Sequence, residues 1–172
     1  MKNYKVGIIG ATGMVGQRFA TLLENHPWFT VTALAASKRS AGKTYKECVE
    51  SRWAMTTPIP KAMEDMIILD AANVEEVASK VDFVFCAVDM PKDQIRELEE
   101  AYAKAECPVV SNNSAHRHTP DVPMVIPEIN ADHIKIIDSQ RKRLGTKKGF
   151  VAVKSNCSLQ SYVPAVHPLR EL

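Results

Sequence analysis

Several features that would assign the sequence to a particular class of protein are missing from it. The four cysteines include no C-x-x-C pair, so no spacing typical of a zinc site or a redox motif is present. No apolar run is long enough to span a bilayer, and no run of basic residues has the length of a binding tail. The net charge is only +2 at pH 7. These absences argue against a membrane protein and against a nucleic acid as partner.

A secretory leader is also not expected, because a strand is predicted almost at the N-terminus and leaves no room for one. Four unpaired cysteines without a secretory context are most simply interpreted as reduced thiols, so we expect a cytoplasmic protein. The composition that remains is ordinary for a globular chain, 45% hydrophobic and 24% charged over 172 residues. This length fits one domain with a substantial core.

Predicted strands and helices alternate along the chain. Strands are expected at residues 5–9, 30–36, 66–70, 81–88, 108–111 and 150–154. Helices are expected at residues 14–25, 74–79, 92–104 and 131–143, with a long loop over 112–130 and an undetermined segment over 47–60. The continuous apolar run 81–88 favours a central strand buried on both faces, whereas 66–70 is predicted to be an edge strand. The pattern predicts an α/β fold, a Rossmann-type parallel sheet with helices on both faces.

A glycine-rich turn follows the first predicted strand and opens the first predicted helix. Its sequence is G-A-T-G-M-V-G, and the residues expected to contact a dinucleotide are Gly10, Thr12, Gly13, Met14, Val15 and Gly16. The first glycine permits the tight turn, the second lets the backbone approach a diphosphate, and the third lets the helix pack on the strand. Free N–H groups at the helix start would bind the phosphates. Glycine spacing alone is weak evidence, and a plain strand–helix turn is the alternative.

The second predicted strand indicates which dinucleotide is bound. An NAD site usually has an acidic residue at the end of this strand, but here the strand ends in Leu-Ala-Ala. The segment that follows contains Ser37, Arg39 and Ser40, whose guanidinium and hydroxyls suit a 2′-phosphate. NADP is therefore the predicted cofactor, unless Arg39 is only a solvated loop cation. Ser111 and Asn112, at the end of another predicted strand, are further expected cofactor contacts.

Cys157 is the candidate nucleophile, because it lies between a predicted strand and an apolar stretch that could begin a helix. N–H groups at a helix start favour the thiolate and could also stabilise an oxyanion on an attacked carbonyl. The alternative is a small buried cysteine, the usual state of a free thiol. The remaining cysteines are expected to be structural: Cys48, Cys86 and Cys107.

Five motifs together resemble aspartate-semialdehyde dehydrogenase, in the form found in its archaeal and fungal branch. In chain order they are the glycine turn over 10–16, S-K-R-S-A-G over 37–42, S-N-N-S-A-H-R over 111–117, V-P-M-V-I-P-E-I-N over 122–130 and S-N-C-S over 155–158. Each motif is moderately specific, but five in order cover nearly the whole chain.

The resemblance implies a reaction and roles for several residues. Cys157 would be the nucleophile that forms a thioester, Asn156 would position it, and Arg117 would bind the phosphate of the substrate. The family reduces aspartyl phosphate to aspartate semialdehyde with NADP, or runs the reverse reaction, in the biosynthesis of lysine, threonine and methionine. The resemblance also implies that the full-length protein acts on small-molecule substrates and forms a homo-oligomer. Glu128 lies in a family-typical segment without a clear role.

The chain departs from the family pattern after the nucleophile. The family's general acid–base histidine and a substrate-binding arginine belong to a second domain, and no histidine here matches that motif. We therefore expect residues 1–154 to form an NADP-binding domain and residues 155–172 to begin a catalytic domain. His116 and His118 lack a third ligand, so no metal site is expected. A chain without the second domain should bind NADP weakly and turn over little or not at all.

Other functions remain open on the sequence. N-acetyl-glutamyl-phosphate reductase resembles this family, but the S-N-C-S tetrad disfavours it. Malonyl-CoA reductase is also similar, and the substrate-selecting half that would separate it is not in this sequence. A nucleotide-binding module without catalysis, such as a redox sensor or scaffold, is a third possibility, in which Cys157 would be unreactive.

Overall fold

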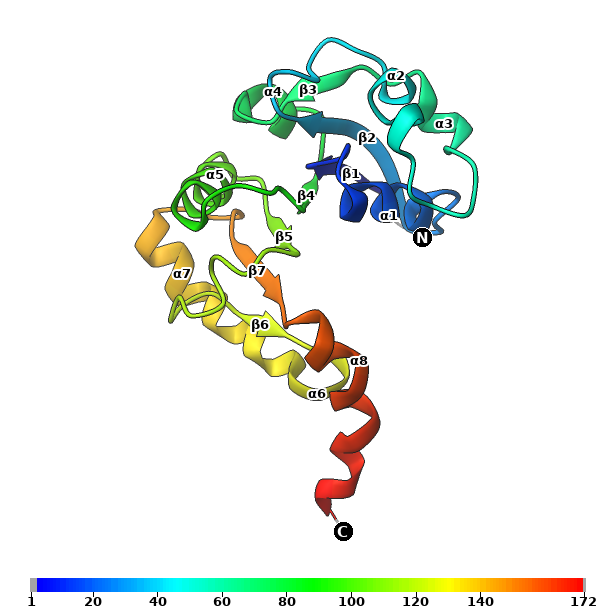
Figure 1. The fold of residues 1–172 in the computed structure, drawn as a ribbon. Coiled ribbons are helices and arrows are strands. Elements are labelled where there is room, and N and C mark those ends of the chain that lie inside the picture. Colours follow the sequence, from blue (N-terminus) through cyan, green and yellow to red (C-terminus); the bar gives the residue numbers. More distant parts are fainter. Residues whose placement is uncertain (1–2, 172) are drawn as a thin grey trace.

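Seven parallel strands form the centre of the computed structural model, which describes residues 3–171 (Figure 1). The strands lie in the order β3-β2-β1-β4-β5-β7-β6. Their bounds are β1 Tyr4–Ile9, β2 Phe29–Ala36, β3 Ile68–Asp70, β4 Phe83–Cys86, β5 Val109–Ser111, β6 Met124–Val125 and β7 Val151–Lys154. All neighbouring pairs are parallel, so the carboxyl ends of the strands meet at one edge of the sheet. The predicted α/β class with a parallel sheet is confirmed.

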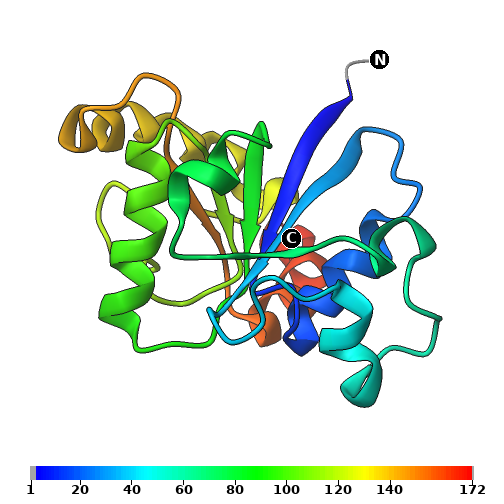
Figure 2. The same ribbon diagram turned by 90° about the horizontal axis from the view of Figure 1, so that it is seen from above.

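Helices cover both faces of this sheet, as Figure 2 shows from above. Their bounds are α1 Met14–Leu23, α2 Tyr45–Val49, α3 Lys61–Glu64, α4 Val74–Ala78, α5 Lys92–Lys104, α6 Pro127–Asn130, α7 Ile137–Leu144 and α8 Cys157–Val166. Short 3₁₀ segments follow three of them, at Glu50–Arg52, Ala131–Ile136 and His167–Glu171. Between residues 3 and 171, no helix has both the length and the apolar character needed to cross a membrane.

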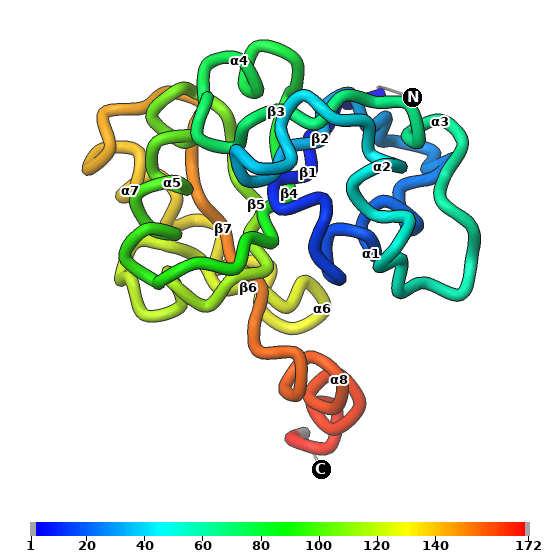
Figure 3. Tube along the Cα trace, turned by 45° about the horizontal axis from the view of Figure 1, so that its top comes forward, coloured from blue at the N-terminus to red at the C-terminus, as the bar shows by residue number. Residues whose placement is uncertain are grey.

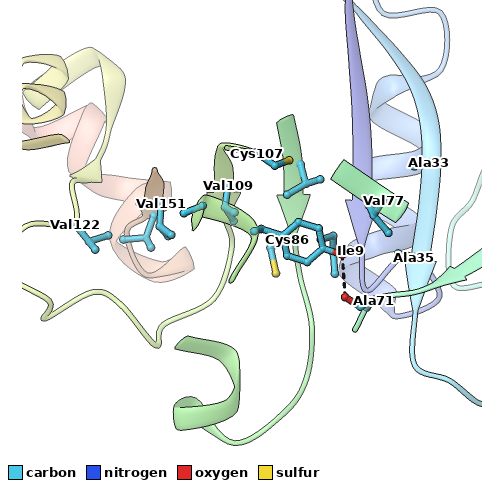
Figure 4. Packing of buried hydrophobic residues seen from close by; sticks show 14 residues of the cluster. Ile9, Ala33, Ala35, Ala71, Val77, Cys86, Cys107, Val109, Val122 and Val151 are labelled. Carbon is cyan, nitrogen blue, oxygen red and sulfur yellow. Dashed lines mark hydrogen bonds between the residues drawn. The ribbon is translucent and has the colours of Figure 1, made fainter. Parts of the chain in front are cut away.

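The core consists of two apolar clusters, one on each face. Successive residues of β1 alternate between them: Ile8 packs beneath α1, α2 and α3, while Ile9 packs beneath α4 and α5. Figure 4 follows the second cluster from Val151 through Val109 and Cys86 to Ile9. The buried Tyr102 of α5 ties that cluster together, because its hydroxyl donates to the carbonyl of Ala71 at 2.8 Å, the dashed line in the figure.

The direction of the sheet order reverses between β1 and β4. From β1 the chain adds β2 and β3 on one side, and it then returns to place β4 and β5 on the other. Such a reversal leaves an opening at the carboxyl ends of the two central strands, because the connections leave them in opposite directions. The expectations of a central strand at 81–88 and an edge strand at 66–70 are both confirmed by this order.

The predicted loop over 112–130 is wrong in part, because it contains β6 and α6. The side chain of Asn130 stabilises both elements: its amide donates to the Met124 carbonyl at 2.9 Å and its oxygen accepts from the Ile126 N–H at 2.7 Å. A two-residue strand has too few positions to produce an alternating pattern. The helix predicted over 131–143 likewise begins as a 3₁₀ segment, and only from Ile137 as α7.

The last helix, α8, leaves the end of β7 and extends away from the rest of the chain, as Figures 1 and 3 both show. Several of its apolar side chains are exposed, among them Leu159, Tyr162 and Val166. The helix therefore presents both its first turn and an apolar surface to the surroundings.

The packing of α1 on β1 makes a specific prediction about Gly16. A Cβ at Gly16 would lie 2.2 Å from the Gly10 carbonyl oxygen and 2.7 Å from the Cα of Ala11, which are backbone atoms that cannot rotate away. Gly16→Ala is therefore expected to lower the free energy of unfolding by about 1–3 kcal/mol in urea titrations. Gly13→Ala is the control, since its Cβ would meet only the Gly10 oxygen at 3.5 Å. Equal losses in the two variants would contradict this account of the packing.

Candidate functional site

The glycine turn between β1 and α1 brings two stretches of backbone unusually close together. Gly10 has φ +83°, a conformation that side chains rarely adopt, and a Cβ there would lie 2.4 Å from the Ala87 carbonyl oxygen beyond β4. The Gly10 N–H donates to the Ala35 carbonyl at 2.8 Å, which ties the turn to β2. The turn therefore packs against the chain at the ends of both neighbouring strands, β2 and β4. Because Gly10 and Gly13 have no side chains, the backbone of the turn is uncovered at these two positions.

Helix α1 begins directly above this turn with its N–H groups accessible. Gly13 is the N-cap residue in an extended conformation, no side chain caps the helix, and its first turn holds no acidic residue. The first N–H groups of a helix have no partner within the helix. Met14 and Val15 are exposed, so this end of the helix is open to an anion.

A pocket of about 600 Å³ lies next to the turn, where the sheet order reverses. It is lined by residues that end or follow β1, β2, β3 and β4, together with one residue each from α5 and the 3₁₀ segment after α2. They are Gly10, Thr12, Gly13, Ala36, Ser37, Lys38, Arg39, Arg52, Asp70, Ala71, Ala72, Ala87, Val88, Asp89, Met90 and Leu98. Its volume falls in the range of small-molecule and cofactor sites.

The structure brings part of the predicted cofactor set into this pocket. Gly10, Thr12, Gly13, Ser37 and Arg39 line it, with Met14 and Val15 at the adjoining helix start and Gly16 beneath the turn. Among the described residues, the pocket lining does not include Ser40, Ser111 or Asn112. Ser40 is buried, and its N–H closes a turn onto the Ser37 carbonyl.

The two residues predicted at the end of β5 are not among the residues lining the pocket, and the Ser111 hydroxyl and the Asn112 backbone N–H have partners inside the protein. The Ser111 hydroxyl is buried and donates to Glu99, and the Asn112 N–H donates to the Cys86 carbonyl at 2.8 Å. Their contact with a cofactor stays a prediction, which would involve the Asn112 side chain more readily than the Ser111 hydroxyl.

Cationic side chains gather on the β2 side of the pocket. Lys38 and Arg52 line it together with Arg39, and within residues 3–171 none of the three forms an ion pair with a carboxylate. Arg52 was not expected from the sequence, because it lies in the segment 47–60 whose structure was undetermined. Asp70 also lines the pocket, but its carboxylate already accepts the Ala72 N–H at 3.0 Å.

The candidate nucleophile lies at the start of α8, as predicted. Asn156 is the N-cap residue, and its side-chain oxygen accepts the Ser158 N–H at 2.9 Å. The Cys157 thiol is exposed and also points to this oxygen, with Sγ and Oδ1 3.8 Å apart. The other cysteines differ: Cys86 and Cys107 are buried, and burial raises the pKa of both thiols, that of Cys107 to about 11. They therefore stay protonated at neutral pH.

Arg117 contacts the chain just before the candidate nucleophile, Cys157. Its Nε donates to the Lys154 carbonyl at 3.2 Å and its Nη2 to the Ser155 carbonyl at 3.3 Å. The guanidinium predicted to bind phosphate is thus anchored at the end of β7, on the two residues that precede Asn156 and Cys157 in the chain. Glu128, in contrast, is exposed in the first turn of α6.

A buried carboxylate on α5 holds the loop that carries Arg117. Glu99 is fully buried, and one of its oxygens accepts from the Ser111 hydroxyl and from the Asn113 amide, the latter at 2.9 Å. One turn earlier, Arg96 donates to the Ala115 carbonyl at 2.8 Å. Helix α5 therefore holds the end of β5 and the first half of the loop at three residues, Ser111, Asn113 and Ala115, just before Arg117.

His116 faces the second oxygen of this carboxylate inside the protein. Its Nε2 lies 4.0 Å from Glu99 Oε2, and neither atom has a hydrogen-bond partner, while Nδ1 lies 3.1 Å from the Thr119 hydroxyl. Burial lowers the pKa of His116 below its usual 6.5, although the charge of Glu99 opposes this shift. His116 is therefore a neutral structural residue at pH 7.

The position of Glu99 in the sequence indicates that it is buried. Glu99 follows Ile95 by four residues and precedes Tyr102 by three, so it lies on the buried face of α5. A charged residue on an apolar helix face requires a polar partner with which it can form hydrogen bonds. Ser111 and Asn113, which follow the helix in the sequence, are these partners.

The glycine turn and Cys157 lie at the same edge of the sheet. The turn follows β1 and Cys157 follows β7, with β4 and β5 between them. Adjacent strands are about 4.8 Å apart, so three steps separate the two strand ends by roughly 14 Å. One extended ligand lying along this edge is the arrangement that could reach both.

Comparisons with known proteins agree with this geometry. Residues 5–137 match the family model described as "Semialdehyde dehydrogenase, NAD binding domain". The chain is 42% identical over 171 residues to the aspartate-semialdehyde dehydrogenase of Archaeoglobus fulgidus, covering 98% of this chain and 47% of the relative. It is 42% identical over 155 residues to that of Aspergillus fumigatus, covering 90% and 41%.

A solved structure, aspartate semialdehyde dehydrogenase with NADP from Candida albicans, superposes with a TM-score of 0.85 at 37% identity. The match covers 99% of this chain and 47% of that one. The chain thus spans about half the length of the curated relatives it matches. The predicted resemblance, including its archaeal and fungal character, is confirmed.

The hydrogen bonds by which Glu99 holds Ser111 and Asn113, here called the Glu99 clamp, are tested by substitution of Glu99. Glu99→Ala leaves the buried Ser111 hydroxyl and Asn113 amide without their acceptor, so we expect the free energy of unfolding to fall by about 2–3 kcal/mol in urea titrations. Glu99→Gln keeps one carbonyl oxygen and should lose less. Glu97→Ala, an exposed position on the same helix, is the control and should change stability by at most about 0.5 kcal/mol. Equal stability of Glu99→Ala and the control would contradict the clamp.

The buried imidazole predicts how stability depends on pH. The pKa of His116 is lower in the folded protein than the usual 6.5, so below that pH the unfolded chain binds a proton that the folded chain does not. Its contribution is present above pH 6.5 and is lost as the pH falls toward the folded pKa. Urea titrations from pH 7.5 to 5 should show this loss in the wild type and a smaller one in His116→Gln. The same pH dependence in both proteins would contradict it, and exposed His118→Gln is the control.

Proposed function

The chain belongs to the semialdehyde dehydrogenase family, whose NAD-binding domain it contains, and we propose that it forms the nucleotide-binding half of an NADP-dependent aspartate-semialdehyde dehydrogenase. The observation that carries this proposal is the placement of an exposed, Asn-capped Cys157 at the same sheet edge as the glycine turn. The relatives named aspartate-semialdehyde dehydrogenase support the substrate, an aspartyl phosphate or its semialdehyde.

The pocket fits a dinucleotide by the shape of its backbone. A side chain at Gly10 would collide with the backbone of Ala87 just after β4, and the first turn of α1 has no side-chain cap on its N–H groups. These features suit a diphosphate, which accepts hydrogen bonds from backbone N–H groups at a helix start. Gly10, Gly13 and the first residues of α1, Met14 and Val15, would hold it.

NADP is proposed over NAD because of the charges at the β2 side. Ala36 ends β2 without a carboxylate, and Ser37, Lys38, Arg39 and Arg52 follow around the pocket. A 2′-phosphate would gain charge-assisted hydrogen bonds from the guanidinium of Arg39, whereas a bare ribose hydroxyl would leave these cations without an anion. The similar enzyme from Candida albicans was solved with NADP, which supports the same choice.

The chemistry assigned to this chain is acyl transfer to Cys157. The thiolate attacks the acyl carbon of the substrate, the phosphate leaves with the electrons of the bond it breaks, and a thioester forms on the sulfur. Asn156 holds the thiol at the helix start, and the backbone N–H groups there stabilise the oxyanion. Arg117 binds the phosphate oxygens. When bound, the nicotinamide supplies the hydride that reduces the acyl group to the aldehyde, which releases the Cys157 thiolate.

We assign residues 1–154 to the nucleotide-binding domain and residues 155–172 to the beginning of the catalytic segment. The general acid–base histidine of the family matches none of the five histidines here. This chain alone should therefore bind NADP and acylate Cys157 while turning over little, because hydride transfer needs a positioned base and substrate. The whole protein is proposed to act as a homo-oligomer on small-molecule substrates in amino-acid biosynthesis.

Cofactor choice is tested by Arg39→Gln. Removal of the guanidinium should weaken NADP binding about tenfold or more and leave NAD binding nearly unchanged, since only NADP has the 2′-phosphate. Isothermal titration of both nucleotides measures the two affinities. Arg18→Gln, an exposed position on α1 outside the pocket lining, is the control. A parallel loss of NAD and NADP affinity would contradict the assignment of Arg39 to the 2′-phosphate.

The reactivity of Cys157 distinguishes an enzyme from a nucleotide-binding module without catalysis. Exposure and the helix start predict that Cys157 is alkylated by iodoacetamide at pH 7 well before the other three cysteines, which peptide mass mapping can follow. Aspartyl phosphate should acylate the same sulfur and protect it. Modification by an acyl-CoA instead would favour the malonyl-CoA reductase alternative, and an unreactive Cys157 would favour a module without catalysis.

A further inference from the structure

Two cationic side chains converge on one carbonyl oxygen just before the nucleophile. Lys154, the last residue of β7, donates from Nζ to the Ser155 carbonyl at 3.2 Å. Arg117 donates from Nη2 to the same oxygen at 3.3 Å and from Nε to the Lys154 carbonyl at 3.2 Å. A single neutral carbonyl thus accepts from both an ammonium and a guanidinium.

The two positive charges are not neutralised inside the protein. Over the described part of the chain, neither Lys154 nor Arg117 forms an ion pair with a carboxylate. Both side chains are half-buried, so solvent screens their mutual repulsion only in part. Partial burial and the Arg117 charge lower the pKa of Lys154, whereas a thiolate on Cys157 raises it. Two close cations without a counterion are the arrangement that an anion stabilises.

The position of the pair defines what it can bind. Its shared oxygen belongs to Ser155, and Asn156 and Cys157 follow directly. A carboxylate would be matched by one guanidinium, which binds both its oxygens. A phosphate group at neutral pH carries between one and two negative charges and three acceptor oxygens, enough for both cations at once.

We propose that Lys154 is a second phosphate-binding residue beside Arg117, the two side chains holding one phosphate group next to Cys157. This inference rests on the proposed function, since it concerns the site where the phosphate leaves. Lys154 then adds a charge and a hydrogen bond to the departing phosphate in the acylation step, and to the attacking phosphate in the reverse reaction. The pattern V-K-S-N-C-S gave no indication of it, because a lysine ending a strand usually reaches solvent.

The test is a titration of the 172-residue chain with inorganic phosphate at pH 7 and constant ionic strength. Two-dimensional ¹H–¹⁵N spectra follow the Arg117 Nε–H and the backbone N–H groups of Asn156 and Cys157. Saturable shifts of these signals are expected in the wild type. Lys154→Gln should raise the phosphate Kd roughly tenfold, the loss of one charge-assisted hydrogen bond, while Lys154→Arg should keep it within about threefold. Lys142→Gln, an exposed lysine on α7, is the control.

Three outcomes would overturn the proposal. They are no saturable shift in the wild type, an unchanged phosphate Kd in Lys154→Gln, and acetate binding as tightly as phosphate, which would indicate a carboxylate site. A far-UV circular dichroism spectrum identical to that of the wild type shows that a variant is folded. NADP titration of the same samples distinguishes failure of the role proposed for Lys154 from failure of the proposed function. If the chain binds NADP but not phosphate, only the role of Lys154 is contradicted. If it fails to bind NADP, the proposed function is contradicted.

Discussion

The contact between the start of α1 and the end of β1 is the constraint on which the rest of the structure depends. The helix approaches so closely that a side chain at Gly16 would overlap the backbone of Gly10 and Ala11, while a side chain at Gly10 would overlap the backbone of Ala87 just after β4. This approach fixes the direction of α1 and points its free N–H groups over the sheet edge. Backbone atoms fill the space between the turn and the start of α1, so the open volume lies on the other side of the turn, where the pocket is found. The diphosphate binding proposed here would therefore depend on this packing and on backbone N–H groups rather than on a charged side chain.

A second chain of contacts links the body of the domain to the candidate nucleophile, Cys157. Glu99 and Arg96 of α5 hold the loop after β5, the loop carries Arg117, and Arg117 binds the carbonyls at the end of β7. The segment of Asn156 and Cys157 begins where these contacts stop. Although α8 extends away from the domain, its first turn is therefore positioned by the hydrogen bonds of Glu99, Arg96 and Arg117 and not by the packing of the helix itself.

Much of this arrangement could be predicted from the sequence, and the exceptions have physical causes. The glycine turn, the parallel sheet and the position of Cys157 follow from local patterns, namely strand, turn and helix in succession. Arg52 and Glu99 were missed because each acts through contacts distant in sequence, Arg52 at the pocket and Glu99 with Ser111 and Asn113. The strand β6 was missed because Asn130 and pairing with β7 stabilise it, not an apolar alternation of its own.

The central claim is that one dinucleotide lies along the sheet edge from the glycine turn toward Cys157, and a crystal structure of the chain with NADP tests it most directly. The account predicts the diphosphate on the N–H groups of Met14 and Val15, the 2′-phosphate beside Arg39, and the nicotinamide ring on the Cys157 side of the pocket. A nucleotide bound elsewhere, or bound here with its nicotinamide directed toward β3, would contradict it.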